Sequence, residues 1–206
     1  MTENNIEAKV IKIGLLGDSR VGKSAICNTF TGIEFNPESV TTIGSDKFEK
    51  KITLKNGKEI KLILWDTAGQ ERFRSAAFKT IKFVQGIVLV FDVSEKGSFD
   101  NINVWLDDIK DNFDNPCLVL FGNKVDKPQE EWEMSREEIN KFVKEKKLAY
   151  FETSAKDNIG IDDGLIHIAN EAYEKLELKK KADPDLNGNK IDINKGGKGK
   201  RRKCCK

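Results

Sequence analysis

Two glycines, a lysine and a serine stand close together in GDSRVGKS, residues 17–24, directly after an apolar run. Backbone that wraps around glycines can point successive N–H groups at a phosphate, and the start of a following helix adds its positive dipole. The Lys23 ammonium would neutralise phosphate oxygens, and the Ser24 hydroxyl is a hard oxygen ligand suited to Mg²⁺. The spacing predicts a phosphate-binding loop, and a strand, a glycine turn and a helix start without any ligand is the alternative.

A second candidate site lies in ILWDTAGQE, where an aspartate follows an apolar run. At the end of a strand, Asp66 would reach Mg²⁺ through a water molecule, although an aspartate in such a place is often only a turn or capping residue. Gly69 would offer its N–H to a terminal phosphate, and Gln70 would orient an attacking water. TAGQ alone also suits an ordinary loop, but its pairing with the first motif favours the functional interpretation.

Two further motifs, GNKVD and ETSAK, would select the base of a nucleotide. The Asp126 carboxylate can accept two hydrogen bonds from guanine, whereas adenine would leave that carboxylate unpaired. An adenine-nucleotide enzyme is therefore the less favoured alternative. Asn123 would bond to the ring or tie loops together, and the Lys124 stem would lie flat on the base. Ala155 would direct its N–H at the guanine oxygen.

Apolar runs that suit strands alternate with segments that suit helices. We expect strands at residues 10–16, 48–54, 59–65, 86–93, 117–123 and 148–153. We expect helices at residues 23–32, 73–82, 98–113, 135–147 and 160–180, and Ser98 as the cap of the third. Asn56-Gly57 predicts a hairpin between the second and third strands. This order predicts a three-layer α/β/α fold with a six-stranded, mostly parallel sheet and one antiparallel strand, and it places all four motifs at the carboxyl ends of strands, where such sheets bind ligands.

Length and composition suit one cytosolic domain followed by a tail. The chain has 206 residues, of which 38% are hydrophobic and 34% charged, with a net charge of +2. The N-terminus lacks the form of a signal peptide, and no apolar run approaches the roughly 20 residues that cross a bilayer. Cys27 and Cys117 lie in apolar segments and are expected to be buried, while Cys204 and Cys205 are neighbours that cannot form a disulfide framework. We expect a monomer that binds no nucleic acid.

Taken together, these motifs resemble those of a Ras-superfamily small GTPase, a P-loop NTPase with a small G domain, and most closely those of the Rab family. The stretches that carry the resemblance are IGLLGDSRVGKS, KLILWDTAGQERFR, LVFDVSEKGSFDNINVWLDDI, FGNKVD and ETSAKDNIGID. We therefore divide the chain into a short N-terminal extension at residues 1–8, a G domain at residues 9–178 and a disordered basic tail at residues 179–206.

The resemblance implies a GTP/GDP switch that binds GTP with Mg²⁺, hydrolyses it slowly to GDP and regulates vesicle trafficking. Gln70 and Lys23 would be catalytic, and Ser24, Thr42 and, through water, Asp66 would hold the metal. Thr42 stands nineteen residues after Lys23 and Phe35 twelve after it, where the family has a switch threonine and an aromatic against the guanine. The full set implied to bind GTP is Gly17, Asp18, Ser19, Arg20, Val21, Gly22, Lys23, Ser24, Ala25, Phe35, Thr42, Asp66, Gly69, Asn123, Lys124, Asp126, Ser154, Ala155 and Lys156.

Several residues depart from the Rab pattern. Arg20 stands where the loop usually has a small residue, and we expect it to point into solvent. Ser39 replaces the aromatic that usually closes over the phosphates, Lys47 replaces a phenylalanine, and Thr80 replaces the aromatic partner of Trp65. These changes put Rab-type effector binding in question, and they leave open a nucleotide-binding module with little or no hydrolysis.

The C-terminal tail carries the features of a membrane anchor. Residues 195–206 hold seven basic residues and no acidic one, and Cys204-Cys205 precedes a final lysine, so this is not a C-a-a-X box. The resemblance implies two prenyl groups, with palmitoylation or free cysteines as alternatives, and a basic solvated tail as the simplest one. Two chains with a polybasic patch hold a protein firmly on anionic membrane. The resemblance also implies prenylation machinery, effectors, an exchange factor and an activating protein as partners, at the cytosolic face of an intracellular or plasma membrane, with a soluble cytosolic pool.

Two other features carry little chemistry. DPDLNGNKID, residues 183–192, imitates the start of a calcium loop, but Asn194 stands where a bidentate glutamate is needed. His167 lies on the apolar face of the last expected helix, and we expect it to be a packing or surface residue rather than a base.

Overall fold

A single six-stranded sheet forms the centre of the molecule, in a computed structural model that describes residues 9–37, 42, 44–69 and 74–182. The strand order is β2-β3-β1-β4-β5-β6, and only the β2–β3 pair is antiparallel, as predicted. Their bounds are β1 Lys9–Leu16, β2 Ser45–Thr53, β3 Glu59–Thr67, β4 Gly86–Asp92, β5 Cys117–Asn123 and β6 Ala149–Thr153. β4 is buried along its whole length, as a central parallel strand requires, whereas β2 at the edge is mostly exposed.

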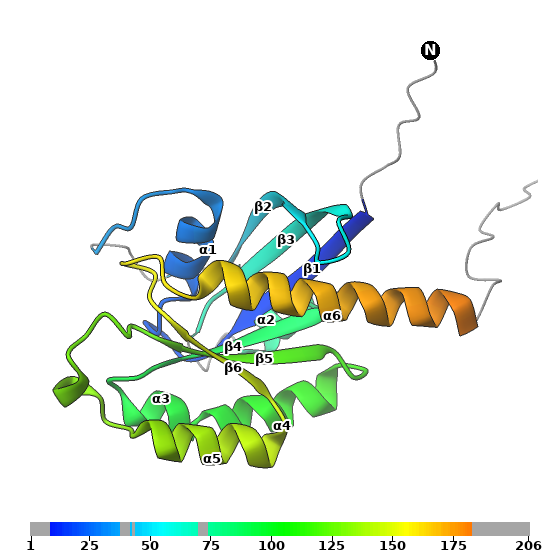
Figure 1. Cartoon of the computed structure of the whole chain (residues 1–206). Helices are drawn as coiled ribbons and strands as arrows, with labels where there is room; N and C mark the ends of the chain where they lie inside the picture. The colour runs from blue at the N-terminus through cyan, green and yellow to red at the C-terminus, as the bar shows by residue number, and fades with distance from the viewer. Residues whose placement is uncertain (1–8, 38–41, 43, 70–73, 183–206) are drawn as a thin grey trace, which may run out of the picture.

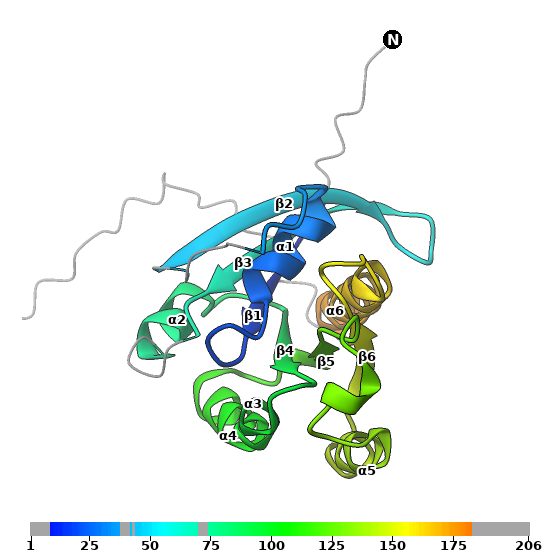
Figure 2. The ribbon, with the colours of Figure 1, turned by 90° about the vertical axis from the view of Figure 1, so that its left-hand side faces the viewer.

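Helices cover both faces of the sheet, so the molecule has three layers (Figures 1 and 2). The helices are α1 Lys23–Thr31, α2 Arg74–Thr80, α3 Lys96–Asp100, α4 Ile102–Asn112, α5 Arg136–Lys146 and α6 Ile161–Ala182, with a short 3₁₀ turn at Gln129–Glu131. α1 and α6 pack on one face through a core that includes Phe30, Leu165 and Ile168. α2, α4 and α5 pack on the other through a core that includes Trp105 and Ile139. The α/β/α prediction is confirmed.

The helix expected at residues 98–113 is two helices, and the expected cap at Ser98 is wrong. α3 begins at Lys96, and Ser98 lies buried inside it, where its hydroxyl donates to the Glu95 carbonyl at 2.7 Å and accepts from the Asp92 N–H at 3.0 Å. The serine therefore fastens α3 to the end of β4 instead of capping a helix. Asn101 divides α3 from α4.

Two other expectations need adjustment. α6 continues through Ala182, so the first four residues of the expected tail are helical. Cys27 is fully buried, but Cys117, at the start of β5, is only half-buried.

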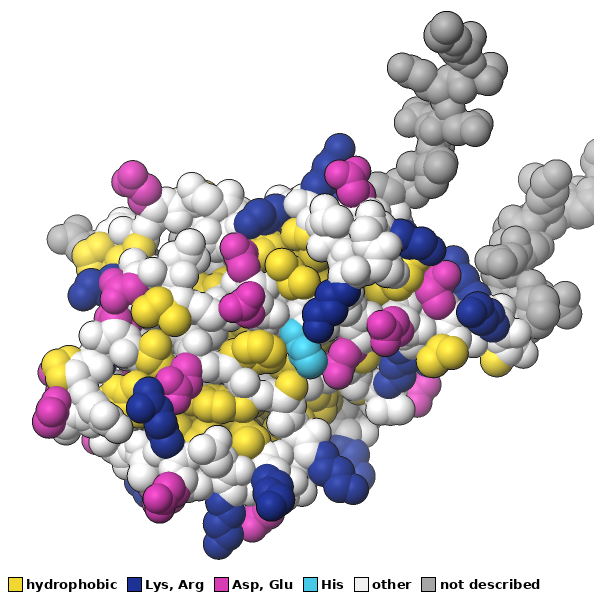
Figure 3. Space-filling view, viewed as in Figure 1, with side chains coloured by type: hydrophobic (Ala, Val, Ile, Leu, Met, Phe, Trp, Pro, Cys, Tyr) yellow, Lys and Arg dark blue, Asp and Glu magenta, His cyan; other side chains and the backbone are white. Residues whose placement is uncertain are grey.

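His167 packs its ring 5.3 Å from that of Phe151 and lies 3.4 Å from a Glu171 oxygen, among hydrophobic side chains at the surface (Figure 3). None of the helices in the described part of the chain is long and apolar enough to cross a membrane.

Candidate nucleotide site

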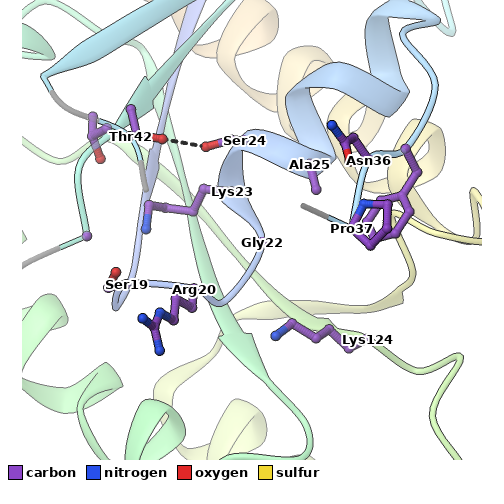
Figure 4. A pocket seen from close by; sticks show the side chains of 13 residues that line it. Ser19, Arg20, Gly22, Lys23, Ser24, Ala25, Asn36, Pro37, Thr42 and Lys124 are labelled. Carbon is purple, nitrogen blue, oxygen red and sulfur yellow. Dashed lines mark hydrogen bonds between the residues drawn. The ribbon is translucent and has the colours of Figure 1, made fainter. Parts of the chain in front are cut away.

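A cavity of about 630 Å³ opens at the carboxyl ends of the strands (Figure 4). Four parts of the chain meet there: the β1–α1 loop, the segment before β2, the end of β3 and the end of β5. The lining residues are Ser19, Arg20, Gly22, Lys23, Ser24, Ala25, Phe35, Asn36, Pro37, Thr42, Thr67, Gly69 and Lys124. Ten of these belong to the predicted nucleotide-binding set, whereas Asn36, Pro37 and Thr67 were not predicted because nothing in their local pattern marks them.

The β1–α1 loop requires its glycines. Gly17 has a φ of 141°, and a Cβ on it would lie 2.1 Å from the Val90 carbonyl oxygen. Gly22 has a φ of 101° and lies against the Asn123 amide, which a Cβ would approach to 2.3 Å. α1 begins directly after Gly22 without a side-chain cap, so its first N–H groups stay available to an anion.

Lys23 extends across this loop and holds it together. Its Nζ donates to the Gly17 carbonyl at 2.9 Å and to the Asp18 carbonyl at 2.7 Å. The side chain is buried, and this burial lowers its pKa from 10.5 to about 8, against the attraction of Asp66 and Asp18. The loop therefore presents a cation whose only partners in the described structure are neutral carbonyls, which suits an incoming anion.

Three side-chain oxygens converge beside Lys23. The Ser24 hydroxyl donates to the Asp66 carboxylate at 2.5 Å and lies 2.6 Å from the Thr42 hydroxyl, and Thr42 also donates to Asp66 at 3.1 Å (Figure 4). Burial raises the pKa of Asp66, and its Oδ1 has no hydrogen-bond partner among the described residues. An orphaned carboxylate oxygen beside two hydroxyls is the donor set that a hard divalent cation prefers, so these residues fit Mg²⁺. They reach one point from α1, the segment before β2 and the end of β3.

The two motifs that were predicted to select the base lie beside the same loop. The Asn123 amide donates to the Val21 carbonyl at 2.8 Å, so Asn123 ties the loops together. The Ser154 hydroxyl donates to the Asp126 carboxylate at 2.7 Å, and Lys156 lies 3.8 Å from its other oxygen. These contacts join GNKVD to ETSAK through the Asp126 carboxylate.

Lys124, in the GNKVD motif, lines the cavity, and its partner Asp92 was not predicted from the sequence. Lys124 has a φ of 69°, and its Nζ lies 2.6 Å from the buried Asp92 carboxylate. Burial alone would raise the pKa of Asp92, but hydrogen bonds from Lys124 and Ser94 hold this pKa below its usual value. Asp92 ends an apolar strand as Asp66 does, and that position was the signal that could have identified it.

The sequence matches the model of the Ras family over residues 12–174, which is more than half of the chain. The chain belongs to the Ras family. It is 38% identical to GTP-binding protein yptV2 of Volvox carteri over 169 residues, which cover 82% of this chain and 77% of that protein. It is 35% identical to GTP-binding protein ypt2 of Schizosaccharomyces pombe and 36% identical to Ras-related protein Rab-10 of Diplobatis ommata, each over 95% of this chain and 96% of the relative. It is a Rab-like small GTPase and thus a GTP hydrolase.

Not every residue predicted for this Ras-family site points into the cavity. Arg20 is exposed with a φ of 68°, and in Figure 4 its side chain points away from Ser24 and Thr42. Val21 is buried, and its carbonyl accepts a hydrogen bond from Asn123. The Asp18 carboxylate accepts hydrogen bonds from Asn101 and from Trp105 of α4, outside the cavity. Gln70, Ser39, Cys204 and Cys205 lie outside the described residues, as does the calcium-like stretch at residues 183–192.

Proposed function

We propose that this Rab-like small GTPase is a GTP/GDP-dependent switch that binds GTP with Mg²⁺ and hydrolyses it slowly to GDP. The observation that carries the proposal is the pairing, on one wall of a cavity, of the buried Lys23 ammonium with the Ser24–Thr42–Asp66 oxygen cluster. A phosphate needs a cation such as the Lys23 ammonium, and a divalent cation needs oxygen ligands such as the Ser24–Thr42–Asp66 cluster.

The chemistry rests on positioning and electrostatics. Loop amides and Lys23 would stabilise charge on the β- and γ-phosphates, while Ser24, Thr42 and Asp66 would hold Mg²⁺, which neutralises phosphate charge when bound. Gln70 would orient the attacking water. None of these residues is a strong base, so we expect slow intrinsic turnover, and a partner's arginine would add about 10³–10⁵-fold.

The nucleotide state would be read through Thr42 and Gly69. Side-chain hydrogen bonds join Thr42 to Ser24 and Asp66, and Thr42 comes from a loop rather than from a strand or helix. Gly69 lies against the Lys23 ammonium, which a Cβ on it would approach to 2.4 Å. Loss of the γ-phosphate would release both residues, and effectors would be exchanged as the two loops relax.

Guanine is the base that the site suits best. Asp126 is fixed on one oxygen by Ser154 at 2.7 Å, which orients the carboxylate toward a base with two adjacent donors. Asn123 is already committed to the Val21 carbonyl, so its role is to join the base loop to the phosphate loop. Adenine lacks the donor pair that Asp126 would accept.

The proposed cellular role is control of vesicle trafficking by a monomer on the cytosolic face of an intracellular or plasma membrane, with a soluble cytosolic pool. Two prenyl groups on Cys204 and Cys205 and the basic tail would supply the attachment, and the partners would be effectors, an exchange factor, an activating protein and the prenylation machinery. Replacing both cysteines by serine should release the tagged protein from membranes, and an unchanged location would refute the anchor.

Purified protein tests the nucleotide proposal directly. GTP and GDP should displace labelled GDP in the presence of Mg²⁺, and ATP at equal concentration should not; displacement by ATP would favour an adenine-nucleotide enzyme. Single-turnover hydrolysis then separates a switch from a binding module, the alternative that the exposed, left-handed Arg20 at the cavity supports. Gln70→Leu should slow hydrolysis at least about tenfold without weakening binding. Equal and negligible rates in both proteins would establish the binding module.

A further inference from the structure

The carboxylate of Asp18 faces away from the cavity and into the junction between α3 and α4. Its Oδ1 accepts a hydrogen bond from the indole N–H of Trp105 at 2.9 Å, and its Oδ2 accepts one from the Asn101 amide at 2.6 Å. Trp105 is 1% exposed, so the donor of this bond is fixed in the core, although Asp18 itself is only partly buried. Both oxygens are therefore held from one side by two residues one helical turn apart.

The second of these bonds comes from Asn101, which lies between α3 and α4. Its backbone angles are nearly helical (φ −71°, ψ −11°), its N–H donates to the Gly97 carbonyl and its carbonyl accepts from the Trp105 N–H, both at 3.1 Å. The Asn101 side chain makes no hydrogen bond that caps α4, and its amide donates to Asp18 instead. The helical backbone on both sides of Asn101 therefore holds the amide that meets Asp18.

The backbone of the same residue forms part of the phosphate cradle. The Asp18 carbonyl accepts from Lys23 Nζ at 2.7 Å, and a Cβ on Gly69 would lie 2.3 Å from that carbonyl oxygen. The side chain and the carbonyl of one residue share the same backbone atoms. Anchoring the carboxylate to α4 therefore fixes the acceptor that holds the lysine and that Gly69 packs against.

Trp105 also connects this anchor to α2. Its ring meets that of Phe78 edge to face, with centroids 6.2 Å apart and planes at 76°, and Phe78 in turn meets Phe113 at 5.8 Å. Trp105 thus lies between the phosphate loop and the helix that follows Gly69 in the chain, and it contacts both sides through different parts of its indole.

Resting on the proposed function, we infer that Asp18, held by Trp105 and Asn101, is a positioning residue that sets how tightly the phosphate loop retains guanine nucleotide. The bond from Trp105 holds the Asp18 carbonyl, which accepts from Lys23, in place. A movement of α2 would be passed on to the phosphate loop through the contact of Phe78 with Trp105. The nucleotide is held by Lys23 and the loop amides, and the anchor outside the cavity decides how well they are placed.

Release of fluorescent (mant) GDP from the full-length protein with Mg²⁺ tests this inference. Asp18→Ala and Trp105→Phe should each speed release about tenfold, since each loses a hydrogen bond to a charged group, and phenylalanine keeps an aromatic ring against Phe78. The double variant should be no faster than Asp18→Ala, because both changes remove the same bond. Asp18→Asn keeps an acceptor for the indole and should stay within about threefold of the wild type.

Trp132→Phe is the matched control, because its indole N–H also donates to an oxygen, the Lys127 carbonyl at 3.1 Å, and it should leave release unchanged. The indole resonance of Trp105, identified by its loss in Trp105→Phe, should move upfield in Asp18→Ala and hold its place in Trp132→Phe. Release of mant-GDP at the wild-type rate from folded Asp18→Ala and Trp105→Phe overturns the inference. So does a double variant whose release rate shows that the two effects add, and so does release from Asp18→Asn that is as fast as from Asp18→Ala. If the wild type takes up no mant-GDP, it is the proposed function that fails.

Discussion

Replacing Lys23 by methionine isolates the free-energy cost of burying its charge. Methionine matches the length of the lysine stem without a titrating group, and Lys23 is only 5% exposed. Burial lowers the pKa of this lysine from 10.5 to about 8 in the folded, nucleotide-free chain. The unfolded chain keeps the ordinary pKa, so the folded and unfolded states bind different numbers of protons between these two values.

The sign and size of the effect follow from this difference. Below pH 8 both states carry the protonated lysine, and the full burial penalty weighs on the folded state. Between pH 8 and 10.5 the unfolded chain binds more protons, so the free energy of unfolding rises with pH by about 1.4 kcal/mol per unit. The wild type should therefore gain roughly 3 kcal/mol relative to Lys23→Met across that interval.

Urea unfolding of both nucleotide-free proteins, from pH 7 to 10.5, measures this difference, and the other titrating groups cancel between them. A repeat with saturating GDP and Mg²⁺ is the internal control, because bound phosphate favours the charged lysine and should move the rise to higher pH. Parallel curves for the wild type and Lys23→Met would refute a buried cation at the site. A difference that falls as pH rises would mean that Lys23 is stabilised by its neighbours more than it is destabilised by burial.

Two more substitutions test the base site and the core. Asp126→Asn should weaken GDP binding at least about 30-fold in a mant-GDP titration, because the loss of the acceptor for a guanine donor costs about 2 kcal/mol of binding free energy. Ser154 can still donate to the amide oxygen of the asparagine. Unchanged affinity would remove Asp126 from the site. Gly164→Ala would place a Cβ 2.4 Å from the Phe121 ring and should lower the free energy of unfolding by about 1–3 kcal/mol in urea. Gly97→Ala meets nothing within 4 Å and should be neutral or stabilising by about 0.5 kcal/mol, so equal losses in both would contradict the packing argument.

The sheet could be predicted from the sequence because its order follows from strand burial and turns. β4 and β5 are short and apolar, which marks them as central strands, and Asn56-Gly57 marks the hairpin, where Gly57 has a φ of 77°. The break between α3 and α4 was not predictable in this way. The apolar period runs straight through Asn101, whose backbone angles are nearly helical and whose hydrogen bonds to Gly97 and Trp105 continue the helical pattern, so the sequence holds no signal for a division there.

For the site, local pattern identified residues that act through the backbone or stand at strand ends, such as Gly17, Gly22 and Asp66. Thr42 required the family resemblance, because nothing in a loop threonine points to the Ser24 hydroxyl, which lies 2.6 Å away. Side-chain direction was out of reach altogether. The sequence places Asp18 in the phosphate loop, but the direction of its carboxylate depends on donors from α4 that are distant in sequence.

The charges at the cavity indicate why this site suits a nucleotide and a cation together. Burial pushes both Lys23 and Asp66 toward their neutral forms, lowering one pKa and raising the other, so each charge lacks the partner that would stabilise it fully. A phosphate alone would attract the Lys23 ammonium but repel the Asp66 carboxylate. A cation alone would attract the carboxylate but repel the ammonium. A phosphate together with a divalent cation would complement both groups at once, and this is the pair of ligands that the proposed function requires.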